Sequence, residues 1–481
     1  MSYTLTVGLE IHLKIKSATK LFCRCTNNQD NDLLVPNSNV CPVCMGQPGA
    51  LPVISSEPLL QSLILGRALG CQINQHSSFD RKSYFYPDLP MGYQITQLFA
   101  PTCTDGQVTF LDESYQQTHH VHIRDAHMET DTVKVIHAQG ESMLDYNRAG
   151  TPLVEVVTGP DFHSTAEVVA FLKEMQRIAR YNDISDADME KWQMRADVNI
   201  SISKTDELGT RVEAKNMNSF SAIVRAIDYE YARQSALLDA GGTVSQETCR
   251  WDDIAGQSIV MRSKEDALDY RYFPDPDLPP LMLTREMLDT VSTQSLIIPS
   301  LFVIRCRDEF GFHKEYINTL IQDESNVHYF LACLEDGCDP RETVKWMAGA
   351  MMAYAKERYL TLTGLPITRG DFVWFLRLVA EQTFISNHYK MIMESMLEHG
   401  WSAEEAIARL SLTPKASGDE GDELLMTTIQ SIVTANPWVV EQYRAGKESA
   451  IGFFVGQVMK QMGGKVDPVL VKAKLEEELK R

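Results

Sequence analysis

A strict two-residue alternation near the N-terminus constrains the fold more than any other feature of this chain. From Tyr3 to Ile15 every odd position is hydrophobic, and the polar residues, Glu10 and His12 among them, occupy even positions. This is the period of a strand with one buried face, so Glu10 and His12 should project together from the other face. A carboxylate beside an imidazole can hold a divalent metal or move a proton. The alternative is the solvated outer face of an edge sheet.

Three further segments carry acidic, His and Arg side chains at the same spacing. Residues 194–203 and 211–215 each present one polar face, made of Arg195, Asp197 and Asn199 in the first segment and of Arg211, Glu213 and Lys215 in the second. In residues 120–129 strict alternation places two polar sets back to back, His120, His122 and Arg124 on one face and Asp125, His127 and Glu129 on the other. A merely solvated sheet would carry more Lys, Thr and Ser, so the sequence predicts an antiparallel sheet that lines an active-site cavity.

Length, net charge and hydropathy limit the number of domains and the classes of binding partner. A chain of 481 residues is too long for one core and predicts two to four domains. The formal net charge of −20 argues against a general nucleic-acid binder, although a local basic patch is compatible with it. No apolar run of about 18 residues and no basic-then-apolar leader is present, so we expect a cytoplasmic protein without membrane contact.

Four of the ten cysteines form two close pairs. Cys23, Cys25, Cys41 and Cys44 follow the first expected strand in the spacing C-x-C-x15-C-P-x-C. Two paired thiol clusters match a tetrahedral structural zinc site, although the first pair has one spacer residue where two are usual. The alternative is ordinary buried or disulfide-bonded cysteine, and a disulfide is disfavoured in a reducing compartment.

The predicted secondary structure changes twice along the chain. Residues 1–293 mix strands with helices capped by Ser164 and Ser219, and residues 294–411 are helical in pattern. A turn-rich acidic stretch, 412–423, then leads into a second helical segment, so residues 412–481 are predicted to form a small tail domain. No Gly-rich phosphate loop occurs, so any ATP would bind on a sheet through a carboxylate-held metal.

Several longer motifs resemble a known family. They are VGLEIH (7–12), FDRKSYFYP (79–87), GYQITQ (92–97), DYNRAGTPLVE (145–155), VEAKNMNSF (212–220), DYRYFPDPD (269–277) and GFFVGQVMK (452–460). Together they resemble the B subunits of tRNA-dependent amidotransferases over nearly the whole chain. The cysteine pairs resemble those of the zinc-carrying members.

The resemblance implies an α+β protein: a glutamine-synthetase-like antiparallel-sheet cradle, a helical domain and a small helical tail that binds tRNA. It implies a ligase that uses ATP and Mg²⁺ to phosphorylate the side-chain carboxylate of Glu-tRNA(Gln) or Asp-tRNA(Asn) and then forms the amide with ammonia. An amidase A subunit would release that ammonia from glutamine, and a small C subunit would complete a heterotrimer. Structural Zn²⁺ would occupy the cysteine loop.

Phosphoryl transfer between anions requires Mg²⁺ and cationic side chains, which assigns roles to the polar residues. The candidates for the Mg²⁺ and ATP site are Glu10, His12, Glu129 and Glu213. Arg195, Lys215 and Arg148 are candidates for phosphate or carboxylate contacts, and Asp197 and Asn199 for orienting these groups or holding ammonia. For Arg148 and Arg195 a structural ion pair is the alternative.

The chain departs from the family pattern at Met91, Thr130 and Gly159. Thr130 follows a candidate metal ligand, so these changes leave a second hypothesis open: a tRNA-binding or assembly subunit with a weakened kinase site. A third hypothesis, a stand-alone ammonia-using ligase, leaves the helical tail without a role.

Overall fold

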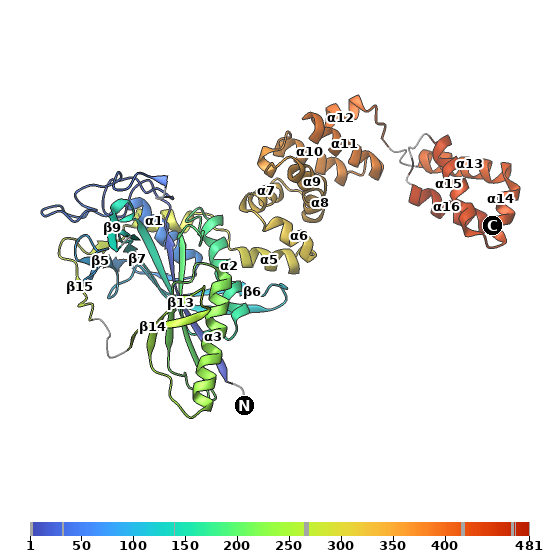
Figure 1. Ribbon diagram of the computed structural model, residues 1–481. Helices are drawn as coiled ribbons and strands as arrows, with labels where there is room; N and C mark the ends of the chain where they lie inside the picture. Colours follow the sequence, from blue (N-terminus) through green and yellow to red (C-terminus); the bar gives the residue numbers. More distant parts are fainter. Residues whose placement is uncertain are drawn as a thin grey trace. The chain divides into compact units, whose positions relative to one another are not determined.

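The computed structural model describes residues 3–30, 33–138, 140–263, 269–414, 419–462, 466 and 468–480. The chain divides into two compact units, Met1–Glu309 and Phe310–Arg481, which are drawn in Figure 1. The division into three domains at 293/294 and 411/412 stays a prediction, as does the likeness to a glutamine-synthetase cradle. Residues 415–418 of the expected linker lie outside the described residues.

A large twisted sheet organises the first unit. Within the described residues it has nine strands in the order β14-β13-β12-β11-β1-β10-β7-β6-β2. Along the chain these are β1 (Thr4–Lys14), β2 (Gln72–Ile73), β6 (Cys103–Leu111), β7 (Thr118–Thr130), β10 (Pro152–Thr158), β11 (Met194–Ser203), β12 (Val212–Lys215), β13 (Glu247–Asp252) and β14 (Gln257–Ser263). The first predicted strand is thus confirmed, and it lies at the centre of the sheet.

The prediction of a purely antiparallel sheet is wrong at one junction. Strands β12 and β13 pair in parallel, whereas every other neighbouring pair of described strands is antiparallel. The physical reason is the connection: helix α3 (Phe220–Asp239) lies between the two strands and returns the chain to the end at which β12 began. The sheet is therefore mixed.

Helices cover the apolar face of this sheet. From Val7 to Leu13 the odd-numbered residues of β1 are fully buried in one hydrophobic core with residues of α1 (Ser56–Ala68), α2 (Thr165–Tyr181) and α3. The predicted helix starts are confirmed, because the Ser164 and Ser219 hydroxyls accept hydrogen bonds from Glu167 N and Ala222 N. Burying each such aliphatic side chain contributes about 1.5–3 kcal/mol, and it leaves the polar face of β1 free for chemistry.

A bulge in β7 overturns the back-to-back arrangement predicted for its polar residues. The register with β10 shifts between Asp125 and Ile123. Val121 and Ile123 are buried before the shift, and Ala126 and Met128 after it. The extra residue reverses the alternation, so both polar sets of β7 lie on the same face of the sheet.

Smaller elements complete the first unit. Three short sheets pair β15 (Phe273–Pro274) with β4 (Asp80–Ser83) and β5 (Tyr93–Thr96), β16 (Leu281–Met282) with β3 (His76–Ser77), and β8 (Lys134–Ala138) with β9 (Glu141–Asp145). Helices α4 (Arg285–Thr293) and α5 (Pro299–Asp308) end the unit.

The described residues of the second unit form helices and the turns between them, with no strand, as the sequence pattern predicts. Its helices are α6 (Lys314–Leu320), α7 (Glu324–Glu335), α8 (Pro340–Trp346), α9 (Met352–Glu357), α10 (Arg369–Ala380), α11 (Ser386–His399), α12 (Ala403–Arg409), α13 (Asp419–Ala435), α14 (Pro437–Arg444), α15 (Ile451–Gln461) and α16 (Pro468–Lys480). The last four share a hydrophobic core centred on Ile429, Phe454 and Leu475. Among the described residues, no helix combines the length and hydropathy that crossing a bilayer requires.

Candidate active site on the polar face of the sheet

Four neighbouring strands place one residue each in a row across the polar face. Arg195 on β11 lies opposite His12 on β1, His12 lies opposite Glu155 on β10, and Glu155 lies opposite His127 on β7. Adjacent strands are about 4.8 Å apart, so these side chains meet directly. Sheet register therefore converts four distant sequence positions into one site.

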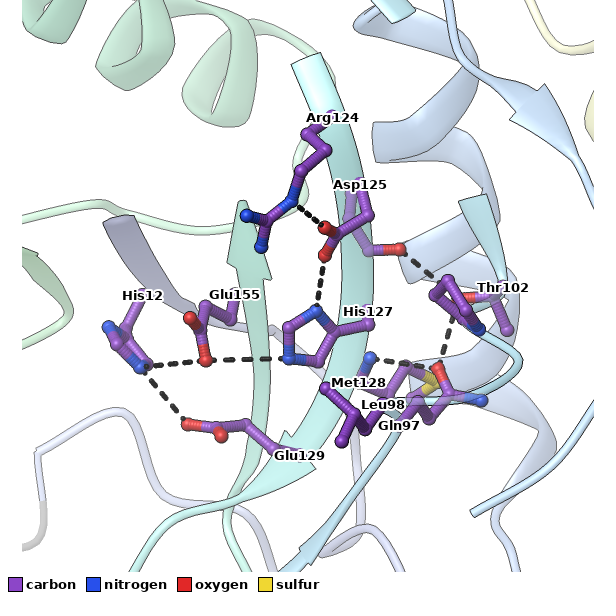
Figure 2. A network of polar contacts seen from close by, with 12 residues as sticks. His12, Gln97, Leu98, Thr102, Arg124, Asp125, His127, Met128, Glu129 and Glu155 are labelled. Atoms are coloured by element: carbon purple, nitrogen blue, oxygen red, sulfur yellow. Dashed lines mark hydrogen bonds and ion pairs between the residues drawn. The ribbon is translucent and has the colours of Figure 1, made fainter. Parts of the chain in front are cut away.

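His12, Glu129 and Glu155 form the first carboxylate group. His12 Nε2 lies 3.3 Å from Glu129 Oε1 and 3.4 Å from Glu155 Oε2, contacts that Figure 2 shows. The Glu129 side chain is 3% exposed. Burial opposes a charge on His12, but Glu155 and Glu129 outweigh it and raise the pKa of His12 to about 10. The group therefore favours a positive charge at its centre, whether a proton or a metal cation carries it.

Glu10, Asp197 and Glu213 form the second group on the same face. Burial, reinforced by Glu155, raises the pKa of Glu10, and Asn199 Nδ2 donates to Glu10 Oε1 at 3.0 Å. Lys215 Nζ lies 2.7 Å from Glu213 Oε1 and forms a second ion pair with Asp197. Although burial opposes ionisation of Glu213, Lys215 lowers the pKa of its carboxyl.

Both groups meet at one cavity of about 260 Å³. Five carboxylates line it, contributed by Glu10, Glu129, Asp131, Glu155 and Asp197, and its cations come from Lys82, Arg195 and Lys215 together with His12. Glu213 is the one member of the two groups outside this lining, within the described residues. Acidic groups beside lysine and arginine side chains are what binding a metal together with an anionic ligand requires.

Arg148 lies elsewhere. It lines a neighbouring cavity of about 610 Å³, and Arg195 and Asp131 border both cavities. Asp131 pairs with Arg195 at 3.1 Å and with Arg148 at 3.5 Å, and although burial opposes its charge, the two guanidinium groups lower the pKa of its carboxyl. The structural ion pair considered for both arginines is therefore present.

Sequence reasoning missed two residues of the site: Glu155 and Lys82. A signal for Glu155 existed, because it is the only charged residue in the apolar run Pro152–Thr158. A lone charge in a central strand requires a partner. Lys82 could not be assigned from periodicity, since it arrives from β4, outside the large sheet.

The three departures from the family pattern lie outside the residues described as lining the 260 Å³ cavity. Because side chains alternate along a strand, Thr130 points away from the face that carries Glu129. Thr130 and Met91 both border a small pocket beside the cysteine loop. Gly159 N donates to His122 O, and a methyl group at Gly159 would approach Asp161 Oδ2 to 2.7 Å.

The four predicted cysteines come together. Their Sγ atoms all lie within 4.8 Å of one another, in the group Cys23, Cys25, Cys41 and Cys44. The Sγ atoms of Cys41 and Cys44 are 3.8 Å apart. Tetrahedral zinc with Zn–S bonds of about 2.3 Å needs sulfur–sulfur separations of about 3.8 Å, so the donor set fits this ion. The hydrogen bond between Cys23 and Cys44 lowers the pKa of Cys44 and raises that of Cys23, so the pair favours one thiolate, the form that a metal binds.

Comparison with known proteins places this geometry in a family. Residues 5–289 match the GatB/GatE catalytic domain, and residues 328–479 match the GatB domain. The chain belongs to the GatB/GatE family. The first match contains every residue of the two carboxylate groups and the cysteine loop.

Full-length relatives in the GatB/GatE family agree. The chain is 38% identical to the B subunit of the aspartyl/glutamyl-tRNA(Asn/Gln) amidotransferase from Symbiobacterium thermophilum, covering 99% of this chain and 98% of the relative. It is 36% identical to the protein of the same name from Caldicellulosiruptor bescii, over all of both chains. It is 39% identical to the B subunit of the chloroplastic/mitochondrial glutamyl-tRNA(Gln) amidotransferase from Ostreococcus lucimarinus, over 98% of this chain and 96% of the relative.

Proposed function

We propose that this chain is the amide-forming subunit of a tRNA-dependent amidotransferase that acts on Glu-tRNA(Gln), Asp-tRNA(Asn) or both. Relatives that the chain matches over at least 98% of their length are named as the B subunit of an aspartyl/glutamyl-tRNA(Asn/Gln) amidotransferase. The observation that carries the proposal is the 260 Å³ cavity, in which two carboxylate groups face lysine and arginine side chains. Such a cavity suits a reaction in which ATP activates a carboxylate.

The proposed reaction has two steps, phosphorylation of the carboxylate and formation of the amide. An oxygen of the aminoacyl side-chain carboxylate attacks the γ-phosphorus of ATP, the bond to the β-phosphate oxygen breaks, and ADP leaves. Ammonia then attacks the carbonyl carbon of the acyl phosphate, the carbon–oxygen bond to phosphate breaks, and the nitrogen loses a proton to give the amide. Activation is needed because a carboxylate is a poor electrophile.

The cationic residues stabilise the charge that develops during these steps. Lys82 and Lys215 face the cavity and can contact phosphoryl oxygens, while Arg195 is held toward it by Asp131. Asn199 fixes Glu10 from the neighbouring strand. Arg148, which borders the adjacent cavity, acts through Asp131 as a positioning residue.

The two carboxylate groups would each hold a divalent cation, with His12, Glu129 and Glu155 in one and Glu10, Asp197 and Glu213 in the other. Oxygen-rich donor sets of this kind suit Mg²⁺ or Mn²⁺, and the single imidazole of His12 is compatible with either. When bound, Mg²⁺ neutralises phosphate charge and so supplies Lewis-acid assistance. This arrangement divides the four predicted ligands between two groups and adds Asp197 and Glu155.

We further propose that ammonia comes from a partner amidase subunit, with a small third subunit completing the complex, and that Zn²⁺ binds the cysteine loop. A closed set of four thiolates has no open position for a substrate, so its role is to brace the segment between β1 and α1.

The test uses the complex with its amidase and third subunit, Glu-tRNA(Gln), ATP and Mg²⁺. Glu10→Ala should lower the rate of phosphate transfer on the order of 10² or more, with tRNA binding and the partner's glutamine hydrolysis preserved. Glu207→Ala, in an exposed turn, is the matched control and should retain the parental rate. Parental amidation by Glu10→Ala would contradict the proposal.

The same assay addresses the weakened-kinase hypothesis. Met91, Thr130 and Gly159 do not belong to the described lining of the cavity, so these three residues do not support the weakened-kinase hypothesis. A parental complex that binds charged tRNA but consumes no ATP in its presence would favour it.

A further inference from the structure

Glu155 is contacted from two sides by imidazole rings. Its Oε2 atom lies 3.4 Å from His12 Nε2 and 3.4 Å from His127 Nε2. His127 Nδ1 lies 2.7 Å from Asp125 Oδ1, and Asp125 Oδ2 accepts a 2.8 Å hydrogen bond from Arg124 Nε. Figure 2 shows this continuous chain, from Arg124 at one end to His12 at the other.

His127 stands behind Glu155 with respect to the cavity. Among the described residues, neither His127 nor Asp125 borders the 260 Å³ cavity, whereas Glu155 does. The metal-compatible group contains His12, Glu129 and Glu155, without His127. His127 is nevertheless enclosed, with 12% of its side chain exposed, and both of its ring nitrogens contact carboxylates. Because it lies outside both the cavity lining and the metal-compatible group, its role is to hold a ligand in place and not to supply a ligand atom.

The β7 bulge makes this chain of contacts possible. Arg124 and Asp125 are consecutive, and in a regular strand their side chains would lie on opposite faces. Because the alternation reverses at this point, the two side chains share a face and form an ion pair. Asp125 is thereby fixed beside His127, and His127 lies directly across from Glu155.

We propose that His127, held by Asp125, is a positioning residue that fixes the Glu155 carboxylate for cation binding. The inference rests on the proposed function, in which the His12–Glu129–Glu155 group holds a divalent cation. A glutamate side chain loses three torsional freedoms when it binds a metal, and a carboxylate already held by a neighbour loses fewer at that moment. Residues that orient a ligand in this way typically change metal affinity by about 10- to 100-fold.

The experiment measures Mn²⁺ binding to the full chain by electron paramagnetic resonance, without tRNA or ATP. His127→Phe keeps a ring of similar size and removes both nitrogens, so the Mn²⁺ Kd of one site should rise about 10- to 100-fold. His127→Gln can still donate to Glu155 and should recover part of that loss. His120→Phe, an exposed residue of the same strand, is the matched control and should bind Mn²⁺ as the parent does.

A second readout separates positioning from a purely structural role. In the amidotransferase complex, His127→Phe should raise the Mg²⁺ concentration for half-maximal activity and leave the KM for charged tRNA close to parental. Thermal unfolding in EDTA should show the same fold in both proteins. If His127→Phe fails to fold, Asp125→Asn, which keeps the shape, takes its place and should also weaken Mn²⁺ binding.

Glu155→Gln distinguishes the two ways in which the idea could fail. If Glu155→Gln binds Mn²⁺ as tightly as the parent, the cation assignment itself is wrong. If Glu155→Gln weakens binding while folded His127→Phe, or Asp125→Asn in its place, retains parental affinity, only the positioning role is overturned.

Discussion

Lys215 illustrates how single residues tune this site. Lys215 forms ion pairs with Asp197 and Glu213, so it neutralises part of the negative charge of the second carboxylate group when no metal cation is bound. Among the described residues Glu10 forms no direct ion pair with a lysine or arginine, and burial raises its pKa although Lys215 opposes the rise, whereas the pKa of Glu213 is lowered. Two carboxylates within one group thus differ in their readiness to lose a proton. Such separation is typical of sites that combine metal binding with acid–base chemistry.

The substitution Thr130→Glu should destabilise the protein without raising its activity. Thr130 departs from the family pattern directly after the candidate ligand Glu129, so a carboxylate placed here tests whether the cavity gains a ligand. Thr130 is buried and borders the pocket beside the cysteine loop, so a carboxylate there would be desolvated. We expect a loss of about 1–3 kcal/mol in the free energy of unfolding, measured by urea denaturation.

Thr130→Val, which keeps the volume and removes the hydroxyl, is the control for this change. It should unfold at a urea concentration much closer to the parental one. An increase in amidation rate or a lower Mg²⁺ requirement in Thr130→Glu would show that this side chain reaches the cavity.

At the scale of elements, sequence periodicity predicted β1, β11 and β12 with their correct faces. It failed at β7 because strict alternation was assumed across the whole strand, although the apolar positions change there from odd (Val121, Ile123) to even (Ala126, Met128), which is the mark of an inserted residue. It also failed to connect Glu155 with His12, since pairing between distant strands depends on tertiary register. The candidate residues were thus readable from sequence, whereas their division into two groups was not.

Glu174 links two helices and gives a pH-dependent prediction. Helix α5 begins without a side-chain cap of its own, and Glu174 Oε1 on α2 accepts a 2.7 Å hydrogen bond from Ser300 N. Burial raises the pKa of Glu174. Glu174→Ala leaves a buried amide without its acceptor, which should cost about 1–3 kcal/mol of unfolding free energy.

Glu174→Gln keeps an acceptor and removes the charge, so its behaviour should depend on pH. Because the folded pKa is raised, the folded state holds the proton more tightly, and the parent loses stability as pH rises from about 4.3 through the folded pKa. Relative to the parent, Glu174→Gln should therefore gain stability over that interval and hold the gain above it. Urea melts at several pH values measure this difference, and a pH-independent difference would contradict the assignment.

The cysteine loop predicts a metal dependence that is separate from catalysis. The purified chain should contain about one equivalent of zinc. Cys41→Ser should lower both the zinc content and the unfolding temperature, while the phosphate-transfer rate of the folded fraction changes little. Cys338→Ser, in the second unit, is the matched control. Full zinc occupancy in Cys41→Ser would exclude the four-thiolate site.

At the scale of the whole molecule, charge is distributed unevenly. The chain carries a net charge of −20, yet the predicted tail, residues 412–481, contains nine basic and ten acidic residues, a net charge of −1. Lys460, Lys472 and Lys474 belong to this segment, and Lys465 lies outside the described residues. A polyanion such as tRNA is therefore repelled less by the tail than by the rest of the chain.

Removal of the tail after Glu423 should weaken tRNA binding selectively. The hydrophobic cluster of the tail lies between Leu425 and Leu479, so its removal leaves the core around the sheet intact. We expect the KM for Glu-tRNA(Gln) to rise on the order of tenfold and to become less sensitive to salt, since fewer phosphate contacts remain. Glutamine hydrolysis by the partner amidase should persist, because that chemistry belongs to another chain. If the truncated complex binds charged tRNA with the affinity and the salt dependence of the full complex, the tail does not contact tRNA, and the basic surface must be sought among the remaining helices.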